Sequence, residues 1–436
     1  MEWKSLKAEQ QPDWQGDKLN SVKAELKRLP ALVFAGEIRK LKRDLHDVSR
    51  GQAFIVQIGD CAEEFDRCNG AELHKFLKVL FQFSNIVSYL SGKRVINIGR
   101  IAGQYAKPRS SNFEIKNEVR YPAYRGDMVN SSMWIESARE HNPERMLKGY
   151  FHSAATLNLL RAFVQGGYGG LDTSENWLEG LSTSSGEGFS EVVQGLKSCL
   201  KFIKANNVGY TDFLNERDYV YTSHEALLLD YEECLTRVDS ITDENYATSG
   251  HFLWIGDRTR QLDGAHVAYC QTILNPIGLK IGPSMSLDDF VSLVDKLNPE
   301  NVSNRLVLIF RLGAQNIEAM LPLFISVVKA RKFNVIWMCD PMHGNTYTTI
   351  GGIKTRNTSV MLRETEFFIN CLIKNDLIPG GIHLEATGGN VTECVDDMIS
   401  FDETLEMNYQ SVCDPRLNYV QTLEFAFLVG KILKED

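Results

Sequence analysis

The sequence lacks the features that mark several large protein classes. It has no uninterrupted apolar run of the roughly 18 residues that a membrane-spanning helix needs. It has no GxxxxGK[ST] string and no GxGxxG string after a candidate strand, which argues against P-loop hydrolases and dinucleotide enzymes. It also has no CxxC pair of the kind that holds structural zinc. We therefore expect neither a membrane protein nor a member of these nucleotide-binding classes.

An excess of basic charge is absent as well. The chain carries 47 Lys and Arg against 56 Asp and Glu, a net charge of −9, whereas a general nucleic-acid binder presents a basic face. Its nine cysteines are scattered and odd in number, which is typical of free thiols in a reducing compartment. Residues 1–5 lack the apolar core of a signal peptide. We expect a cytoplasmic protein with no nucleic-acid or membrane partner.

The composition is that of a large globular protein. Of 436 residues, 43% are hydrophobic and 24% are charged, enough for a sizeable buried core. From about residue 51, short apolar runs alternate with helical patterns, which indicates β-α-β units and a parallel sheet covered by helices. We predict the α/β class and a (β/α)8 TIM barrel, with a doubly wound open sheet as the alternative. The predicted strands are Phe54–Ile58, Arg94–Ile98, Tyr219–Thr222, Phe252–Ile255, Gly278–Ile281, Leu306–Phe310, Val335–Met338 and Gly381–Leu384.

Two regions fall outside this alternation. Residues 1–50 are polar, with helical spacing at 18–28 and 35–48, and are predicted to form an N-terminal helical extension to a catalytic barrel domain at 51–436. Between the second and third strands, the Gly-, Ser- and Thr-rich stretch 166–188 precedes an amphipathic helical pattern at 189–205. We expect a helical insertion at about 166–217, serving either as a surface or oligomer contact or as a regulatory site.

Polar residues follow nearly every predicted strand. Because all strands of a parallel barrel end on one face, these side chains should meet there. One group offers sulfur, nitrogen and oxygen donors, a mixture that suits a borderline divalent ion better than Mg²⁺ or Ca²⁺. We expect Mn²⁺ or Co²⁺, with Fe²⁺ or Zn²⁺ as alternatives. The candidate metal ligands are Cys61, His343, Glu385 and Asp414.

A second group is cationic and consists of Arg100, Arg258, Lys280 and Arg311. Arg presents a planar fork to phosphate oxygens and Lys a point charge. The segment from Lys107 to Ser111 adds two cations and two hydroxyl groups. This number of cations indicates a site for two phosphorylated groups.

Ten strings in this sequence resemble class II (plant-type) 3-deoxy-D-arabino-heptulosonate 7-phosphate (DAHP) synthases. The resemblance runs in collinear order from about residue 14 to the C-terminus. Strings of this length are far more specific than a short motif. They are GDCAE at 59–63, GRIAGQYAKPRS at 99–110, YRGDMVN at 124–130, GYFHSAATLN at 149–158, TSHEA at 222–226, WIGDRTR at 254–260, CDPMHGNT at 339–346, HLE at 383–385, VTEC at 391–394 and CDPRLN at 413–418.

The resemblance implies the condensation of phosphoenolpyruvate with erythrose 4-phosphate to DAHP and phosphate, the first step of the shikimate pathway. It implies that Cys61, His343, Glu385 and Asp414 bind the metal. It implies that the cations Arg100, Arg258, Lys280 and Arg311, with the acid Asp257, hold phosphoenolpyruvate. Lys107 and Ser110 would face erythrose 4-phosphate. A homo-oligomer and aromatic amino-acid effectors, acting at the N-terminal extension or the insertion, are expected by the same analogy.

Two points stay open at this level. Glu63, His224 and Glu225 are all candidates for the general acid or base, and the sequence does not choose among them. Asp257 stands where the family usually has Glu, so its shorter side chain puts its contact in doubt. The alternatives are a paralogue with a different aldose-phosphate acceptor or a role in secondary metabolism, and a catalytically silent regulatory barrel.

Overall fold

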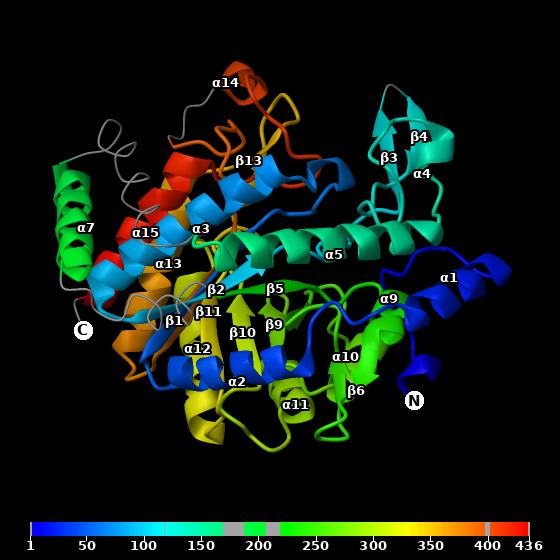
Figure 1. Cartoon of the computed structure of the whole chain (residues 1–436), viewed down its shortest axis with the longest axis horizontal. Coiled ribbons are helices and arrows are strands. Elements are labelled where there is room, and N and C mark those ends of the chain that lie inside the picture. The colour runs from blue at the N-terminus through cyan, green and yellow to red at the C-terminus, as the bar shows by residue number, and fades with distance from the viewer. Residues whose placement is uncertain (1, 117, 169–186, 206–218, 397–401, 435–436) are drawn as a thin grey trace.

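A closed barrel of eight parallel strands forms the centre of the protein (Figure 1). The computed structural model describes residues 2–116, 118–168, 187–205, 219–396 and 402–434. Every predicted barrel strand is found within a few residues of its expected bounds, and the closed strand order excludes the open sheet. In order around the barrel the strands are β1 (Ala53–Gly59), β14 (Pro379–Glu385), β11 (Ile336–Cys339), β10 (Leu306–Phe310), β9 (Ile277–Ile281), β8 (Phe252–Ile255), β5 (Val220–Glu225) and β2 (Arg94–Arg100).

The strands are buried on both faces because side chains alternate between the barrel interior and the surrounding helices. Ile98, Tyr221 and Ile309 belong to the interior cluster, whereas Val56 and Leu308 pack in the layer beneath the helices. The covering helices are α3 (Gly70–Ser91), α10 (Ala265–Gln271), α11 (Leu287–Leu297), α12 (Ile317–Arg331), α13 (Thr358–Ile373) and α15 (Tyr419–Lys434).

Helix α2 (Ala35–Ser49) crosses beneath the barrel in Figure 1 and closes its N-terminal end. Leu41, Leu45 and Val48 are fully buried and share one cluster with interior residues such as Ile55 and Met338. This part of the N-terminal extension is therefore integral to the barrel core. Helix α1 (Asp17–Arg28) packs instead against α9 (Leu229–Leu235) and α5 (Glu144–Gln165).

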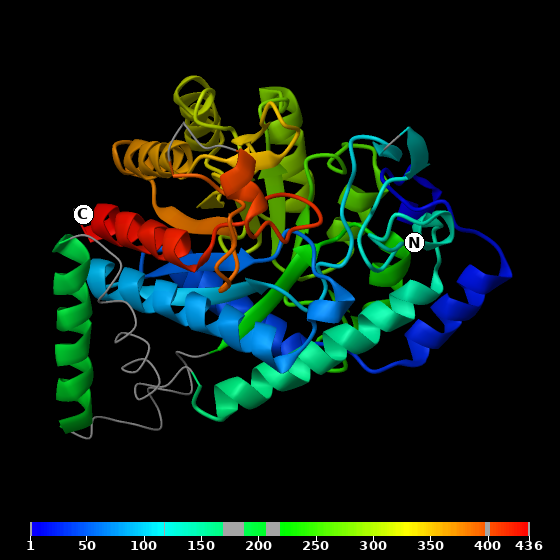
Figure 2. The same cartoon turned by 90° about the horizontal axis from the view of Figure 1, so that it is seen from above.

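The connection between β2 and β5 carries a hairpin of β3 (Phe113–Lys116) and β4 (Val119–Pro122), then α4 (Glu136–Arg139), α5 and α7 (Glu187–Ala205). Helix α7 confirms the predicted helix at 189–205 and packs against α3 (Figure 2). The predicted loop at 166–188 lies mostly outside the described residues, as does the end of the predicted insertion at 206–217.

Between residues 225 and 237, helical structure is confined to a short stretch. Only α9 is helical, and β6 (Thr236–Val238) then pairs with β7 (Asn245–Ala247), where β-branched residues favour a strand. The remaining elements are η1 (Glu2–Ser5), η2 (Phe65–Arg67), β12 (Thr346–Thr348), β13 (Lys354–Arg356) and α14 (Asp402–Glu406). None of the described helices combines the length and apolar character needed to cross a bilayer.

Candidate active site

One cavity of about 240 Å³ opens at the C-terminal ends of the barrel strands. It brings together all four predicted metal ligands and every predicted substrate-binding residue except Ser110. Its lining residues are Cys61, Arg100, Gln104, Lys107, Pro108, Glu225, Trp254, Gly256, Asp257, Arg258, Lys280, Arg311, His343, Thr346, Lys354, Glu385 and Asp414.

The predicted metal ligands converge on one side of this cavity. Donor atoms of Cys61, Glu385 and Asp414 lie within 4.8 Å of one another, and His343 Nε2 lies 3.0 Å from Glu385 Oε1. Burial alone would raise the pKa of Glu385, but His343, Arg356 and Arg100 outweigh it and hold that pKa well below its usual range. Ionised carboxylates beside a sulfur and an imidazole suit a borderline divalent cation.

Asp340 sets the orientation of His343. Its Oδ2 lies 2.8 Å from His343 Nδ1, which leaves Nε2 directed at Glu385. A carboxylate on the far nitrogen of a ligating imidazole is a common feature of metal sites. Both nitrogens of His383 are already engaged, Nε2 by Arg100 Nη1 and Nδ1 by Gln57 Oε1 at 2.6 Å. The imidazole available for a metal is therefore that of His343.

Arg100 and Lys280 are the deepest cations of the cavity. Arg100 is 2% exposed and its Nη2 donates to Glu385 Oε1 at 3.0 Å. Lys280 Nζ lies 2.5 Å from Asp340 Oδ2. Burial lowers the pKa of Lys280 to about 8, with Asp340 opposing this fall and Arg100 adding to it.

Arg311 and Asp257 form the next pair along the wall. Arg311 Nη1 lies 3.0 Å from Asp257 Oδ2, and Arg260 Nε lies 2.9 Å from Asp257 Oδ1. The shorter side chain of Asp257 thus still reaches Arg311. Gly282 permits this contact, because an added Cβ would lie 2.8 Å from Asp257 Oδ2 and 2.9 Å from Arg311 Nη1.

Exposed residues form the rim of the cavity. Arg258 Nη2 donates to Ser110 Oγ at 2.8 Å, so Ser110 stands beside the cavity although it does not line it. Lys107 Nζ contacts both Cys61 Sγ and Asp414 Oδ2. Burial would lower the pKa of Lys107, but Asp414 and Cys61 outweigh it and hold that pKa well above its usual range.

Among the three candidates for a general acid or base, Glu225 is the one that lines this cavity. Its Oε1 is buried and has no hydrogen-bond partner among the described residues. Burial raises the pKa of Glu225, although Lys280, Arg258 and His343 oppose the shift. Such a carboxylate can exchange a proton with a bound molecule.

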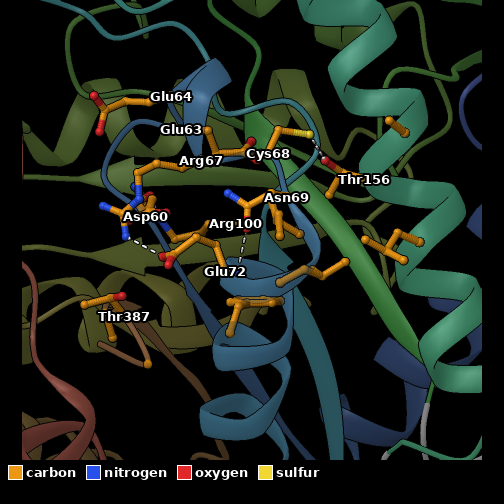
Figure 3. A pocket seen from close by; sticks show the side chains of 17 residues that line it. Asp60, Glu63, Glu64, Arg67, Cys68, Asn69, Glu72, Arg100, Thr156 and Thr387 are labelled. Carbon is orange, nitrogen blue, oxygen red and sulfur yellow. Dashed lines mark hydrogen bonds and ion pairs between the residues drawn. The ribbon is translucent and has the colours of Figure 1, made fainter. Parts of the chain in front are cut away.

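Glu63 lies on the wall of a neighbouring cavity together with Cys68 and Thr156 (Figure 3). Its carboxylate accepts hydrogen bonds from the backbone amides of Ala102, Gly103 and Gln104, at 3.0, 2.9 and 2.7 Å. Burial raises its pKa to about 7, against the opposing effect of these amides. These contacts fix the loop after β2.

His224 lies behind the same loop, away from the metal ligands. It is 2% exposed, and its Nε2 lies 2.8 Å from Glu232 Oε1, which is held in turn because Ser249 Oγ donates to Glu232 Oε2 at 2.5 Å. Gly103 passes so close that an added Cβ would lie 2.5 Å from His224 Nδ1. His224 therefore supports the cavity wall from outside.

Sequence reasoning missed several residues of the site. Asp340 could have been found, because it lies between the predicted strand and His343. Arg356 carried no such signal: it comes from the β12–β13 hairpin, is fully buried, and donates from Nη1 to Glu385 Oε2 at 2.7 Å and to Pro415 O at 2.5 Å. Lys354, at the start of β13, lies 3.2 Å from Asp414 Oδ1 through its Nζ.

Comparison with known proteins identifies the family to which the chain belongs. A family model described as the class-II DAHP synthetase family matches residues 1–430. A phospho-2-dehydro-3-deoxyheptonate aldolase of Streptomyces coelicolor is 42% identical over all of this chain and 97% of its own length. Proteins of that name from Mycolicibacterium smegmatis (AroG; 39%, 98% of this chain and 93% of its own) and Neurospora crassa (40%, 100% and 94%) are similar to this chain too. The chain therefore belongs to the class-II DAHP synthetase family.

Proposed function

We propose that this protein condenses phosphoenolpyruvate with D-erythrose 4-phosphate to give DAHP and inorganic phosphate, at the entry to the shikimate pathway. The observation that carries the proposal is the convergence of a metal-ligating set and a row of cations on one cavity. The family membership of the chain and the names of its relatives support the same reaction.

Cys61, His343, Glu385 and Asp414 would hold the divalent ion, for which their donor chemistry and convergence are suitable. When bound, such an ion polarises the aldehyde oxygen of the acceptor. The mixed donor set accommodates Mn²⁺, Co²⁺, Fe²⁺ and Zn²⁺, and we propose Mn²⁺ or Co²⁺, with Fe²⁺ and Zn²⁺ as alternatives, by analogy with the family.

The cations hold the two anionic substrates side by side. Arg100, Lys280 and Arg311 are proposed to bind phosphoenolpyruvate, with Arg258 at the mouth, while Asp257 fixes the guanidinium of Arg311. Lys107 and Ser110 are proposed to face the phosphate of the acceptor. When both reactants are bound in the reactive orientation, a bimolecular step becomes effectively unimolecular, and the entropic part of the barrier falls.

Glu225 is the proposed general acid or base. The condensation requires a proton at the former aldehyde oxygen and removal of a proton from the water that adds at C2, before phosphate leaves. Glu225 lines the cavity with an Oε1 that is unpartnered among the described residues, which favours it over the other two candidates. The Glu63 carboxylate is held by backbone amides, and His224, whose Nδ1 is also unpartnered there, lies outside the cavity against Gly103.

The test is a phosphate-release assay of the purified protein with both substrates. We expect phosphate release that requires erythrose 4-phosphate, is lost after chelation and dialysis, and returns on adding Mn²⁺ or Co²⁺. A panel of other aldose phosphates tests whether the protein is a paralogue with a different acceptor. If one of them reacts faster than erythrose 4-phosphate, that compound is the acceptor. Absence of turnover with every acceptor, despite bound metal, would favour a silent regulatory barrel.

The cavity also predicts a pH dependence. Lys280, with its pKa near 8, is charged below that pH and neutral above it, so its attraction for the phosphate of the free substrate falls as pH rises. We expect kcat/KM for phosphoenolpyruvate to decline as pH rises through about 8, whereas kcat declines less because a bound phosphate stabilises the charged amine. A Lys280→Arg variant, which stays charged, should lose this alkaline limb at whatever absolute rate it retains. If kcat/KM of the Lys280→Arg variant still fell as pH rises through about 8, the fall would arise from the titration of another group.

Oligomeric state and regulation are proposed by analogy with the family. We propose a homo-oligomer and aromatic amino-acid effectors, with the N-terminal extension and the insertion as the contact or sensing regions. Exposed Phe34, just before α2, supports an apolar contact at the N-terminal extension. All nine cysteines are free in the described chain, which supports a reducing compartment such as the cytoplasm.

A further inference from the structure

A buried glutamate outside the cavity joins two of the loops that build it. Glu364 lies on α13 and is 1% exposed. We propose that Glu364 is a positioning residue that fixes the phosphate-binding Arg311 relative to the metal ligand His343. This inference rests on the proposed function, since it concerns the alignment of the two substrates.

The two oxygens of Glu364 accept from different loops. Oε1 accepts from the backbone amide of Gly313, in the loop that follows β10 and Arg311, at 2.8 Å. Oε2 accepts from Asn345 Nδ2, in the turn that follows β11 and His343, at 2.5 Å. Asn345 Oδ1 accepts in turn from Ala314 N at 3.0 Å. The carboxylate and the amide side chain therefore close a ring between the loops.

The backbones of these loops are in direct contact inside this ring. Gly313 has φ of 82°, and a Cβ added to it would lie 2.7 Å from Gly344 O. A Cβ on Gly344 would lie 2.3 Å from Gly313 N. Arg311 Nη2 donates to His343 O at 2.8 Å. Any displacement of one loop is thus transmitted to the other, and with it to either the phosphate side or the metal side of the cavity.

Burying the carboxylate of Glu364 costs free energy of desolvation. Burial raises the pKa of Glu364 to about 7, against the opposing effect of its bonds to Asn345 and Gly313. Stability alone does not favour a carboxylate that must be desolvated to this extent. A group with two acceptors is nevertheless needed here, because the donors facing it come from two separate loops.

Glu364→Gln is the decisive variant, because it keeps shape and one acceptor but turns Nε2 toward Asn345 Nδ2, a donor against a donor. We expect kcat to fall about tenfold to a hundredfold, because a displacement of about 1 Å caused by a change away from the reacting atoms can cost on the order of a hundredfold in rate. KM for phosphoenolpyruvate, and Kd for Mn²⁺ measured by titration calorimetry, should change by less than about threefold, because each ligand alone needs only one half of the site.

The pairing can be restored by exchanging the two functional groups. In Glu364→Gln with Asn345→Asp, the new amide donates to the new carboxylate, while the bond that Asn345 Nδ2 donates to Pro341 O at 2.8 Å is lost. We therefore expect kcat to recover in part. Asn345→Asp alone places two carboxylates against each other and should be impaired. Glu366→Gln is the matched control, since it makes the same change at an exposed position of α13 and should behave as the parent protein.

Three outcomes would overturn the positioning role. They are parental kcat in Glu364→Gln, a parallel loss of Tm, Mn²⁺ binding and substrate binding that marks a merely structural residue, and simple additivity in the double variant. The parent protein assayed alongside separates the two proposals. An inactive parent overturns the proposed function and this inference with it, whereas an active parent and an equally active Glu364→Gln overturn this inference alone.

Discussion

Replacement of His343 by alanine is expected to reduce condensation by more than about a hundredfold while the protein stays folded. Removing a residue that hydrogen-bonds a metal ligand typically lowers metal affinity or activity about ten- to a hundredfold, and removing the ligand itself should lower them further. His343 is also the imidazole whose Nε2 faces Glu385, so the variant leaves that buried carboxylate with fewer partners. The measurements are kcat with saturating Mn²⁺ and the Kd for Mn²⁺ from calorimetry.

His46→Ala is a matched control for this experiment. His46 lies on α2 at the closed end of the barrel and is exposed, with Ser303 Oγ at 3.1 Å from its Nδ1. Its loss should leave both kcat and metal affinity unchanged. A His343→Ala protein that bound Mn²⁺ as tightly as the parent, with kcat within tenfold, would remove His343 from the proposed ligand set.

Glu225→Gln should lower kcat by about a hundredfold to ten-thousandfold, the range that general acid–base catalysis contributes. The amide keeps the size of the side chain but cannot transfer the proton, so KM for both substrates should change little. The parent protein should show a limb in its kcat–pH profile that Glu225→Gln removes. Loss of activity at low pH would identify Glu225 as a base, and loss at high pH as an acid.

Glu63→Gln provides the comparison. Its amide keeps one acceptor for the loop amides of residues 102–104, so we expect a lower Tm and an unchanged pH profile. If Glu63→Gln, rather than Glu225→Gln, removed the pH limb, the assignment of the proton-transfer residue would pass to Glu63.

The parallel direction of the barrel strands explains how much of the site could be predicted from the sequence. All strands end on one face, so the residues after each predicted strand could be gathered without a structure. Alternation along β5 predicts that His224 and Glu225 point to opposite faces, and the structure shows which of them faces inward. Tyr221 faces the barrel interior, so Glu225, four residues on, faces inward too, and His224 faces the surrounding layer.

The remaining residues could not be found in this way. Arg356 reaches Glu385 from a hairpin outside the barrel, and Glu364 acts from a helix through two loops. Their roles depend on where separate segments cross in space, and local sequence pattern carries no information about that. Glu63 was a candidate by its proximity to Cys61, yet a turn of the chain directs it to the backbone of another loop.

Because helix α2 closes one end of the barrel, it restricts the order in which the two substrates can bind. With that end sealed by α2, molecules exchange at the opposite end of the barrel, where exposed Arg258 lines the cavity and exposed Ser110 stands beside it. Buried Lys280 and Arg100 lie at the far end of this passage. The molecule held by the deep cations must enter before the one held at the rim, and an acceptor bound first would block the way. If the deep cations hold phosphoenolpyruvate as proposed, this architecture favours an ordered sequence in which phosphoenolpyruvate binds first.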